Sequence, residues 1–155
     1  MDIIQKYNQL LEYIPQENSC IKNIKNEQLY KDLLHFLNKN NLRNILISLS
    51  GGVDSMVLFD LLNHIKQNDV NQLNIYVCHI DYNNRSVSND EKDFLIEYCT
   101  LKGYELKYIS HDFKRNELKR DIYEKRTTKL RYEFYETLIK QFHLQGVLLA
   151  HHKDD

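Results

Sequence analysis

The fold of this chain is decided by the stretch Asn44-Ile45-Leu46-Ile47-Ser48-Leu49-Ser50-Gly51-Gly52-Val53-Asp54-Ser55. Its first half is a short apolar run rich in isoleucine and leucine, which is typical of a buried β-strand. From Val53 to Gln67 the apolar residues recur at helical spacing. Two adjacent glycines separate these parts, in a chain that holds only four glycines. The stretch therefore predicts a buried strand, a tight turn and a helix.

The same alternation of strand and helix patterns continues along the rest of the chain. Strands are predicted over Leu73–Ile80, Glu105–Ser110 and Gly146–Ala150. Helices are predicted over Ser88–Leu101, which opens on a capping-box pattern, and over Glu124–Phe142. Together these elements favour an α/β domain with at least four parallel strands and helices on both faces. Sheets of this kind bind their ligands at the carboxyl ends of the strands.

The first part of the chain precedes this pattern. Residues 1–14 carry apolar side chains at helical spacing, and so do the residues from Tyr30 to Leu37. We therefore expect residues 1–40 to form an N-terminal helical extension and residues 41–155 to form the sheet domain.

The composition excludes several classes of protein. The 155 residues are 42% apolar and 28% charged with a net charge of -1, which indicates one globular domain and excludes a uniformly basic nucleic-acid coat. No apolar run approaches the roughly 18 residues of a membrane span, and the first residues lack the layout of a secretion signal. Three widely separated cysteines form no CxxC pair. This spacing disfavours a disulfide framework and indicates a reducing, cytoplasmic compartment.

Residues 50–55 have the properties of a phosphate cradle. The two glycines allow the backbone to approach an anion closely, and the N–H groups at the start of the following helix point toward it. Ser50 and Ser55 add hydroxyl donors. The carboxylate of Asp54 would repel phosphate unless it holds Mg²⁺, which is commonly bound by one or two carboxylates together with substrate phosphates. The alternative is a plain strand–turn–helix junction in which Asp54 favours the helix dipole.

This hexapeptide resembles the PP-loop of the N-type ATP pyrophosphatases, and it lacks the lysine of a Walker A loop. Members of that family cleave ATP between the α- and β-phosphates and transfer AMP to a carbonyl oxygen. The resemblance implies a Rossmann-like adenine nucleotide alpha hydrolase fold with three α/β/α layers, and it implies ATP and Mg²⁺ as ligands. The residues that it assigns to ATP binding are Ser50, Gly51, Gly52, Val53, Asp54 and Ser55.

Two further motifs follow predicted strands. After the fourth strand, Ala150-His151-His152-Lys153-Asp154-Asp155 resembles the AHHxDD motif of the tRNA(Ile)-lysidine synthases and the related tRNA 2-thiocytidine enzymes. A polar tail and a metal site are the alternatives for this motif. After the second strand, His79 and Arg85 match another pattern of that family, whereas Tyr82 stands in the place of its second histidine. A histidine with satisfied hydrogen bonds at a strand end is the alternative for His79.

A basic segment overlaps the last predicted helix. Residues 114–131 hold eight basic and three acidic side chains, a net charge of +5 in a chain whose total is -1. Within this segment, Glu124–Tyr132 resembles the ARxxRY helix start of the lysidine synthases, with one extra residue between Arg126 and Arg131. Such a patch suits the steering of phosphate or RNA, although a solvated helix face would carry the same charges.

Taken together, the four motifs occur in the order of the tRNA(Ile)-lysidine synthase family, and the chain resembles the N-terminal catalytic portion of such a ligase. In that family the C2 carbonyl oxygen of the wobble cytidine, in an isoleucine tRNA with a CAU anticodon, is adenylated, and L-lysine then displaces AMP. The resemblance implies that Asp54 helps to bind Mg²⁺ and that Asp155, with Asp154 as the alternative, completes the metal or lysine site. It also implies that Arg126 or Arg131 neutralises charge during AMP transfer, and that His79 takes part in ATP binding.

Three other interpretations stay open at this point. The family motif continues past the paired aspartates, where this sequence stops, so a non-catalytic module that binds adenine nucleotide is one alternative. A PP-loop enzyme of tRNA 2-thiolation is disfavoured because such enzymes usually carry CxxC cysteines. A small-substrate PP-loop enzyme is disfavoured by the AHHxDD motif and by the basic helix.

Overall fold

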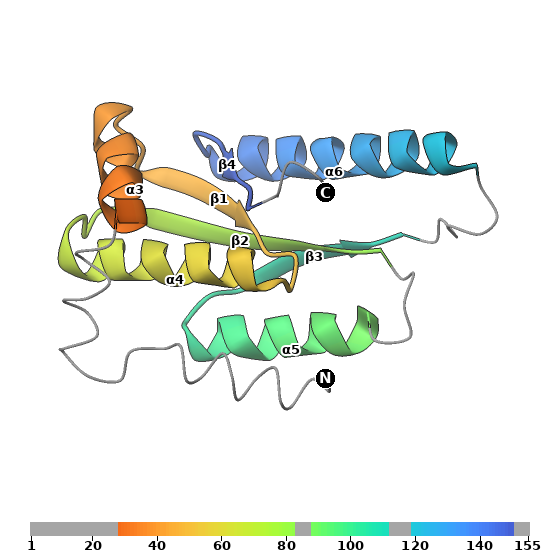
Figure 1. Ribbon diagram of the computed structural model, residues 1–155, viewed down its shortest axis with the longest axis horizontal. Coiled ribbons are helices and arrows are strands. Elements are labelled where there is room, and N and C mark those ends of the chain that lie inside the picture. Colours follow the sequence, from red (N-terminus) through yellow and green to blue (C-terminus); the bar gives the residue numbers. More distant parts are fainter. Residues whose placement is uncertain (1–27, 83–87, 112–118, 151–155) are drawn as a thin grey trace.

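The computed structural model describes residues 28–82, 88–111 and 119–150 (Figure 1). The helix predicted over residues 1–14 and the motif at residues 151–155 lie outside the described residues. The same holds for Arg85 and for the side chain of Ser88, so the predicted capping box is not among the described contacts.

Eight helices and strands alternate along the described residues. In chain order they are α3 (Gln28–Lys39), β1 (Asn44–Ser48), α4 (Val53–Asn68), β2 (Asn74–Asp81), α5 (Ser88–Leu101), β3 (Leu106–Ser110), α6 (Arg120–Phe142) and β4 (Val147–Leu148). Within these ranges, no helix is long and apolar enough to span a bilayer.

The four strands form one parallel sheet in the order β3-β2-β1-β4. The chain moves outward from β1 through β2 to β3, and it then returns through α6 to add β4 on the other side of β1. Strand β1 pairs with β2 over its whole length and with both residues of β4. The order of the strands therefore reverses beside β1, which is the place where open α/β sheets bind their ligands.

Alternate residues of the strands face opposite layers of helices. Ile45 and Ile47 of β1 lie in the larger apolar core, with α4 and α5, whereas Leu46 lies in a smaller core with α6. Figure 1 shows α4 and α5 on one side of the sheet and α6 on the other. The predicted α/β/α arrangement is therefore confirmed. Leu33 and Leu37 of α3 also belong to the larger core; the domain boundary expected at residue 40 stays a prediction.

One glutamine side chain ties the start of β1 to the segment before β4. The Oε1 atom of Gln145 accepts hydrogen bonds from the backbone N–H groups of Arg43 and Asn44, at 2.6 and 2.9 Å. Its Nε2 atom donates to the carbonyl of Asn41 at 3.1 Å, and its backbone N–H donates to the carbonyl of Asn44 at 2.8 Å. These bonds hold the register of β4 against β1 in addition to the short ladder between the two strands.

The largest differences between the predicted and the observed elements lie in two places. Helix α6 begins at Arg120, four residues before the predicted start at Glu124. Its first turn is mostly exposed and so has no apolar periodicity, but Asp121 favours the helix dipole there and Arg120 Nε bonds Glu124 Oε1 at 3.0 Å. Strand β4 comprises two residues rather than the predicted five, because only Val147 and Leu148 pair with β1.

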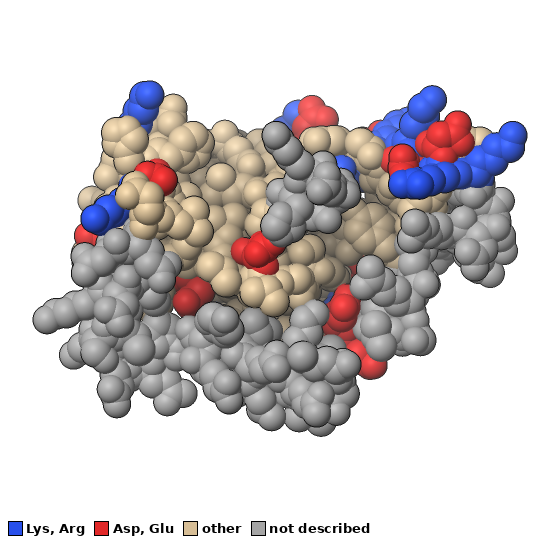
Figure 2. Space-filling model, viewed as in Figure 1, with Lys and Arg blue, Asp and Glu red and all other residues tan. Residues whose placement is uncertain are grey.

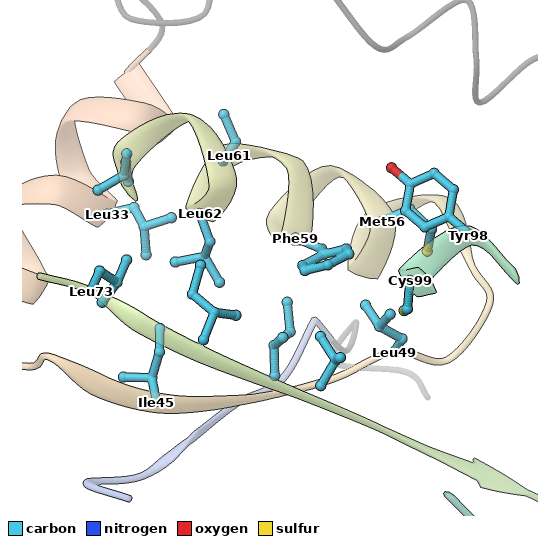
Figure 3. Packing of buried hydrophobic residues seen from close by; sticks show 14 of the residues in the cluster. Leu33, Ile45, Leu49, Met56, Phe59, Leu61, Leu62, Leu73, Tyr98 and Cys99 are labelled. Carbon is cyan, nitrogen blue, oxygen red and sulfur yellow. The ribbon is translucent and has the colours of Figure 1, made fainter. Parts of the chain in front are cut away.

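Phe59 provides a test of the larger core, where it packs between α4 and the sheet (Figure 3). Its side chain is fully buried, and its ring centroid lies 6.2 Å from that of Tyr98 and 5.3 Å from that of Tyr104. We expect Phe59→Ala to lower the free energy of unfolding by about 3–5 kcal/mol, because it removes a large side chain and leaves a cavity. Urea unfolding followed by circular dichroism measures this loss.

The matched control is Leu101→Ala in α5, where the leucine side chain is 68% exposed. An exposed substitution of this kind should change the free energy by less than about 0.5 kcal/mol. Equal losses in the two variants would contradict the placement of Phe59 in the core.

Candidate functional site

A sharp turn joins β1 to α4 at the carboxyl edge of the sheet. Gly51 has a φ of +83°, and Gly52 is the N-cap of α4 with an extended backbone. Only glycine adopts a positive φ of this kind at little cost, which explains the residue at position 51. A Cβ atom placed there would meet nothing closer than the Glu91 carboxyl group at 3.8 Å, so the conformation, and not the space, requires glycine.

Hydrogen bonds within the loop hold this turn. The Ser55 hydroxyl donates to the carbonyl of Gly52 at 3.1 Å and accepts from the backbone N–H of Ser50 at 3.2 Å. The Ser50 hydroxyl accepts from the backbone N–H of Gly52 at 3.2 Å. The side chain of Ser55 is almost fully buried. These hydroxyls brace the loop, whereas their predicted role as donors to phosphate stays a prediction.

The start of α4 gives this loop its capacity to bind an anion. The first bond within the helix runs from the N–H of Met56 to the carbonyl of Gly52, at 3.3 Å. The N–H groups of the three preceding residues have no carbonyl one turn earlier in the helix, and they lie at the positive end of the helix dipole. An anion beside Gly51 and Gly52 would be stabilised by both effects. Asp54, in the first turn, is exposed beside the same loop.

His79 lies under the loop, at the carboxyl end of β2. Its side chain is 4% exposed, and its Nδ1 atom lies 2.6 Å from the carbonyl oxygen of Leu49, the residue directly before the loop. Burial lowers the pKa of His79, against the smaller raising effects of this hydrogen bond and of nearby Asp81 and Glu91. A neutral imidazole then donates its Nδ1 proton to the carbonyl. His79 therefore positions the loop, and its predicted contact with ATP stays a prediction.

For two carboxylates near the loop, the sequence predicted no binding or catalytic role. Glu91, in the first turn of α5, brings its carboxyl group beside Gly51. Asp81 is 2% exposed at the end of β2; it accepts a hydrogen bond from the Ser110 hydroxyl at 3.1 Å and lies 4.0 Å from Lys92 Nζ. Two features of the sequence could have identified them: Asp81 lies at the carboxyl end of a strand, and Glu91 lies at the start of the next helix.

Helix α6 reaches the same edge from the opposite face of the sheet. The Tyr135 hydroxyl donates to the Ser48 hydroxyl at 2.8 Å, two residues before the loop. Burial raises the pKa of Tyr135 to about 12, so its proton stays in this bond. One turn earlier, the half-buried Arg131 lies near the Tyr82 side chain, directly after β2, and its charge opposes the rise in the pKa of Tyr82 that burial causes.

The two arginines that were candidates for catalysis do not point to one place. Arg126 and Arg131 are five residues apart in a helix, which places them about 140° apart around its axis. Arg131 faces the sheet edge and Tyr82, whereas Arg126 is exposed. Of the two, the structure brings only Arg131 to the side of the helix that meets the sheet.

The first half of α6 carries a concentration of basic side chains (Figure 2). Residues 119–131 hold six basic and two acidic residues, a net charge of +4. In Figure 1, this end of α6 extends past the ends of the strands. The predicted metal residue Asp155 lies outside the described residues. Among the residues that the structure describes, no three His, Cys, Asp or Glu side chains gather closely enough to hold a metal.

Comparison with known proteins gives one family and several relatives. Residues 25–155 match the model of the PP-loop domain. The chain is 32% identical over 120 residues to a tRNA(Ile)-lysidine synthase of Mycoplasmopsis pulmonis, covering 71% of this chain and 35% of that protein. It is 32% identical over 113 residues to the tRNA(Ile)-lysidine synthase of Enterococcus faecalis, covering 73% and 23%. The chain thus spans about a third or less of the length of these curated relatives.

A solved structure supports the fold. The U34-tRNA thiolase NcsA from Methanococcus maripaludis, solved with its 4Fe–4S cluster, superposes with a TM-score of 0.65. The match covers 88% of this chain and 47% of that chain, at 18% sequence identity. At this identity the likeness concerns the fold alone, and it confirms the predicted class of α/β fold.

The neutral state of His79 predicts a pH dependence of stability. In the unfolded chain a histidine takes up a proton near pH 6.5, whereas burial keeps His79 neutral in the folded chain to a lower pH. Its contribution is therefore present above pH 6.5 and is lost as the pH falls toward the folded pKa. We expect the stability advantage of the parent chain over His79→Asn to shrink below pH 6.5, by up to about 1.4 kcal/mol per pH unit.

Urea unfolding of both proteins at pH 7.5, 6.5 and 5.5 measures this difference. The comparison cancels the other titrating groups, which the two proteins share. An advantage that stays the same at all three pH values would contradict a neutral His79.

Proposed function

We propose, because this chain belongs to the PP-loop domain family, that it binds ATP and forms the nucleotide-binding part of a tRNA(Ile)-lysidine synthase. The observation that carries the proposal is the glycine turn at the strand-order reversal, with the start of α4 directed at the place where phosphate would lie. The similarity to tRNA(Ile)-lysidine synthases supports the choice of reaction within the family.

The residues present fit ATP and its metal ion. The backbone of Gly51 and Gly52 and the N–H groups at the start of α4 would bind the phosphates. Exposed Asp54 is suited to Mg²⁺ that is shared with the phosphates. When bound there, Mg²⁺ would neutralise charge on the phosphates. Asp155 is the second proposed ligand.

The reaction has two steps in this proposal. The C2 carbonyl oxygen of the wobble cytidine forms a bond to the α-phosphorus of ATP as the bond to the β-phosphate oxygen breaks, and pyrophosphate leaves. The ε-amine of L-lysine then attacks C2, AMP leaves, and a proton is released from the nitrogen. Arg131, at the edge of the sheet, would stabilise the charge on the transferred phosphate. The basic half of α6 would attract the tRNA backbone.

A cytoplasmic location, where tRNA is processed, is part of the proposal.

Two glycines with nearly the same positive φ allow an effect on ATP binding to be distinguished from an effect on stability. Gly51 has a φ of +83° in the loop, and Gly103 has a φ of +86° after α5, with open space around it. We expect alanine at either position to destabilise the fold by about 1 kcal/mol or slightly more, because of the strained backbone. Only Gly51→Ala should also weaken ATP binding, by about tenfold or more, because it shifts the donors of the loop.

Calorimetric titration with Mg²⁺-ATP and urea unfolding of the two variants measure these effects. Equal ATP affinity in both variants would show that the nucleotide binds elsewhere.

The reaction itself is tested by AMP release from α-labelled ATP, with and without bulk tRNA and lysine. We expect AMP only when tRNA is present, and lysidine only when lysine is added. Asp54→Asn should lower AMP formation about 100-fold, a loss comparable to the removal of one electrostatic contact to a transition state. The exposed Asp32 of α3, changed to asparagine, is the control.

ATP binding without AMP formation would favour the nucleotide-binding module. Full activity of Asp54→Asn would remove the role proposed for Asp54.

A further inference from the structure

Helix α6 presents an exposed stripe of two lysines and a tyrosine beside the face that packs on the sheet. Lys125, Lys129 and Tyr132 are spaced by four and three residues, so they lie on one face of the helix. All three are exposed, and the side chain of Tyr132 is 55% exposed. On the adjoining face of α6, Tyr135 and Leu138 pack into the smaller core. The stripe is therefore a solvent-facing surface and not part of the fold's interior.

The tyrosine of this stripe is held in place although it is exposed. The guanidinium carbon of Arg131 lies 5.6 Å from the centroid of the Tyr132 ring. The ring of Tyr135 meets it edge-on, with the centroids 6.3 Å apart. Such contacts restrict the ring before any ligand arrives, which lowers the entropic cost of stacking on it.

The net positive charge of α6 lies in the part of the helix before this tyrosine. Residues 119–131 carry a net charge of +4, while the chain as a whole carries -1, so the remaining residues sum to -5. After Tyr132 the exposed charges are paired, as in Lys140 with Glu136 at 3.2 Å. Lys129 lies 3.8 Å from Glu133, but an exposed pair of this kind is weak, and its lysine can turn to a phosphate.

We propose that this stripe binds single-stranded RNA, with Lys125 and Lys129 on successive phosphates and a nucleobase stacked on Tyr132. Single-stranded RNA is commonly bound by basic grooves together with aromatic rings on which bases stack. The contact lies close to the carboxyl edge of the sheet, because Arg131, beside the Tyr132 ring, is also near Tyr82, directly after β2. The inference rests on the proposed function, and it adds a specific contact surface for the tRNA substrate.

The absence of tryptophan from the sequence allows a direct test. Tyr132→Trp creates a protein with one tryptophan in the proposed stacking position. Tyr108→Trp is the matched control: Tyr108 is 47% exposed and has a cation over its ring, Lys92 Nζ at 5.2 Å. It lies on β3 with its side chain toward α5, across the sheet from α6. Each full-length variant is titrated with a short single-stranded RNA, with the same RNA as a duplex, and with inorganic polyphosphate.

We expect single-stranded RNA to quench the fluorescence of the tryptophan at position 132 strongly, and duplex RNA or polyphosphate to quench it little. The tryptophan at position 108 should respond to none of them. In a separate titration with fluorescein-labelled RNA, Tyr132→Ala should bind about fivefold more weakly or worse, as expected for loss of one stacked base. Urea unfolding confirms that the variants fold.

Four results would overturn the inference. If labelled RNA binds the parent chain but position 132 is not quenched, the base does not stack there, and the proposed function stands. If polyphosphate quenches as strongly as RNA, the response is ionic and no base is recognised. If the fluorescence of the tryptophan at position 132 is quenched as the protein concentration rises in the absence of RNA, the stripe is a contact between copies of the chain. Failure of the parent chain to bind any RNA would count against the proposed function as well.

Discussion

Strand β1 is hydrogen-bonded to β2 on one side and to β4 on the other. Its position determines where the candidate site lies. The strand leads directly into the glycine turn, so whatever holds the strand also aims the turn. His79 fixes the carbonyl of Leu49 from the side of β2, and Tyr135 bonds Ser48 from the opposite face. The loop therefore has a rigid support on both faces of the sheet, which is what a preorganised anion site requires.

The two layers of helices have different tasks around this support. On the side of α4 and α5, the sheet meets a large apolar core with aromatic contacts around Phe59. On the other side the core is smaller, and α6 continues beyond the strands as a mostly polar helix. Stability is concentrated on one face, and the charged surface that suits a polyanion is concentrated on the other.

The fold and the glycine turn could be predicted because their causes are local. Apolar periodicity marks each strand and helix, and a glycine pair between a strand and a helix marks the turn. The start of α6 was placed too late because its first turn is mostly exposed, so burial left no apolar periodicity there. Contacts such as Tyr135 with Ser48, or Glu91 beside Gly51, join residues that are far apart in the sequence. No local pattern encodes such pairs, and the choice of Arg131 over Arg126 depends on the rotation of a helix that the sequence leaves undetermined.

The bonds made by Gln145 have a consequence for the order in which the chain assembles. The glutamine closes on Arg43, which precedes it by 102 residues, so this contact has a higher loop-closure entropy cost than the neighbouring pairing of β1 with β2. Contacts of high sequence separation form slowly. During synthesis β1 can pair with β2 early, but its other edge waits until the segment around residue 145 has left the ribosome. The glycine turn, although encoded near the beginning of the domain, would then reach its final rigidity among the last parts of the fold.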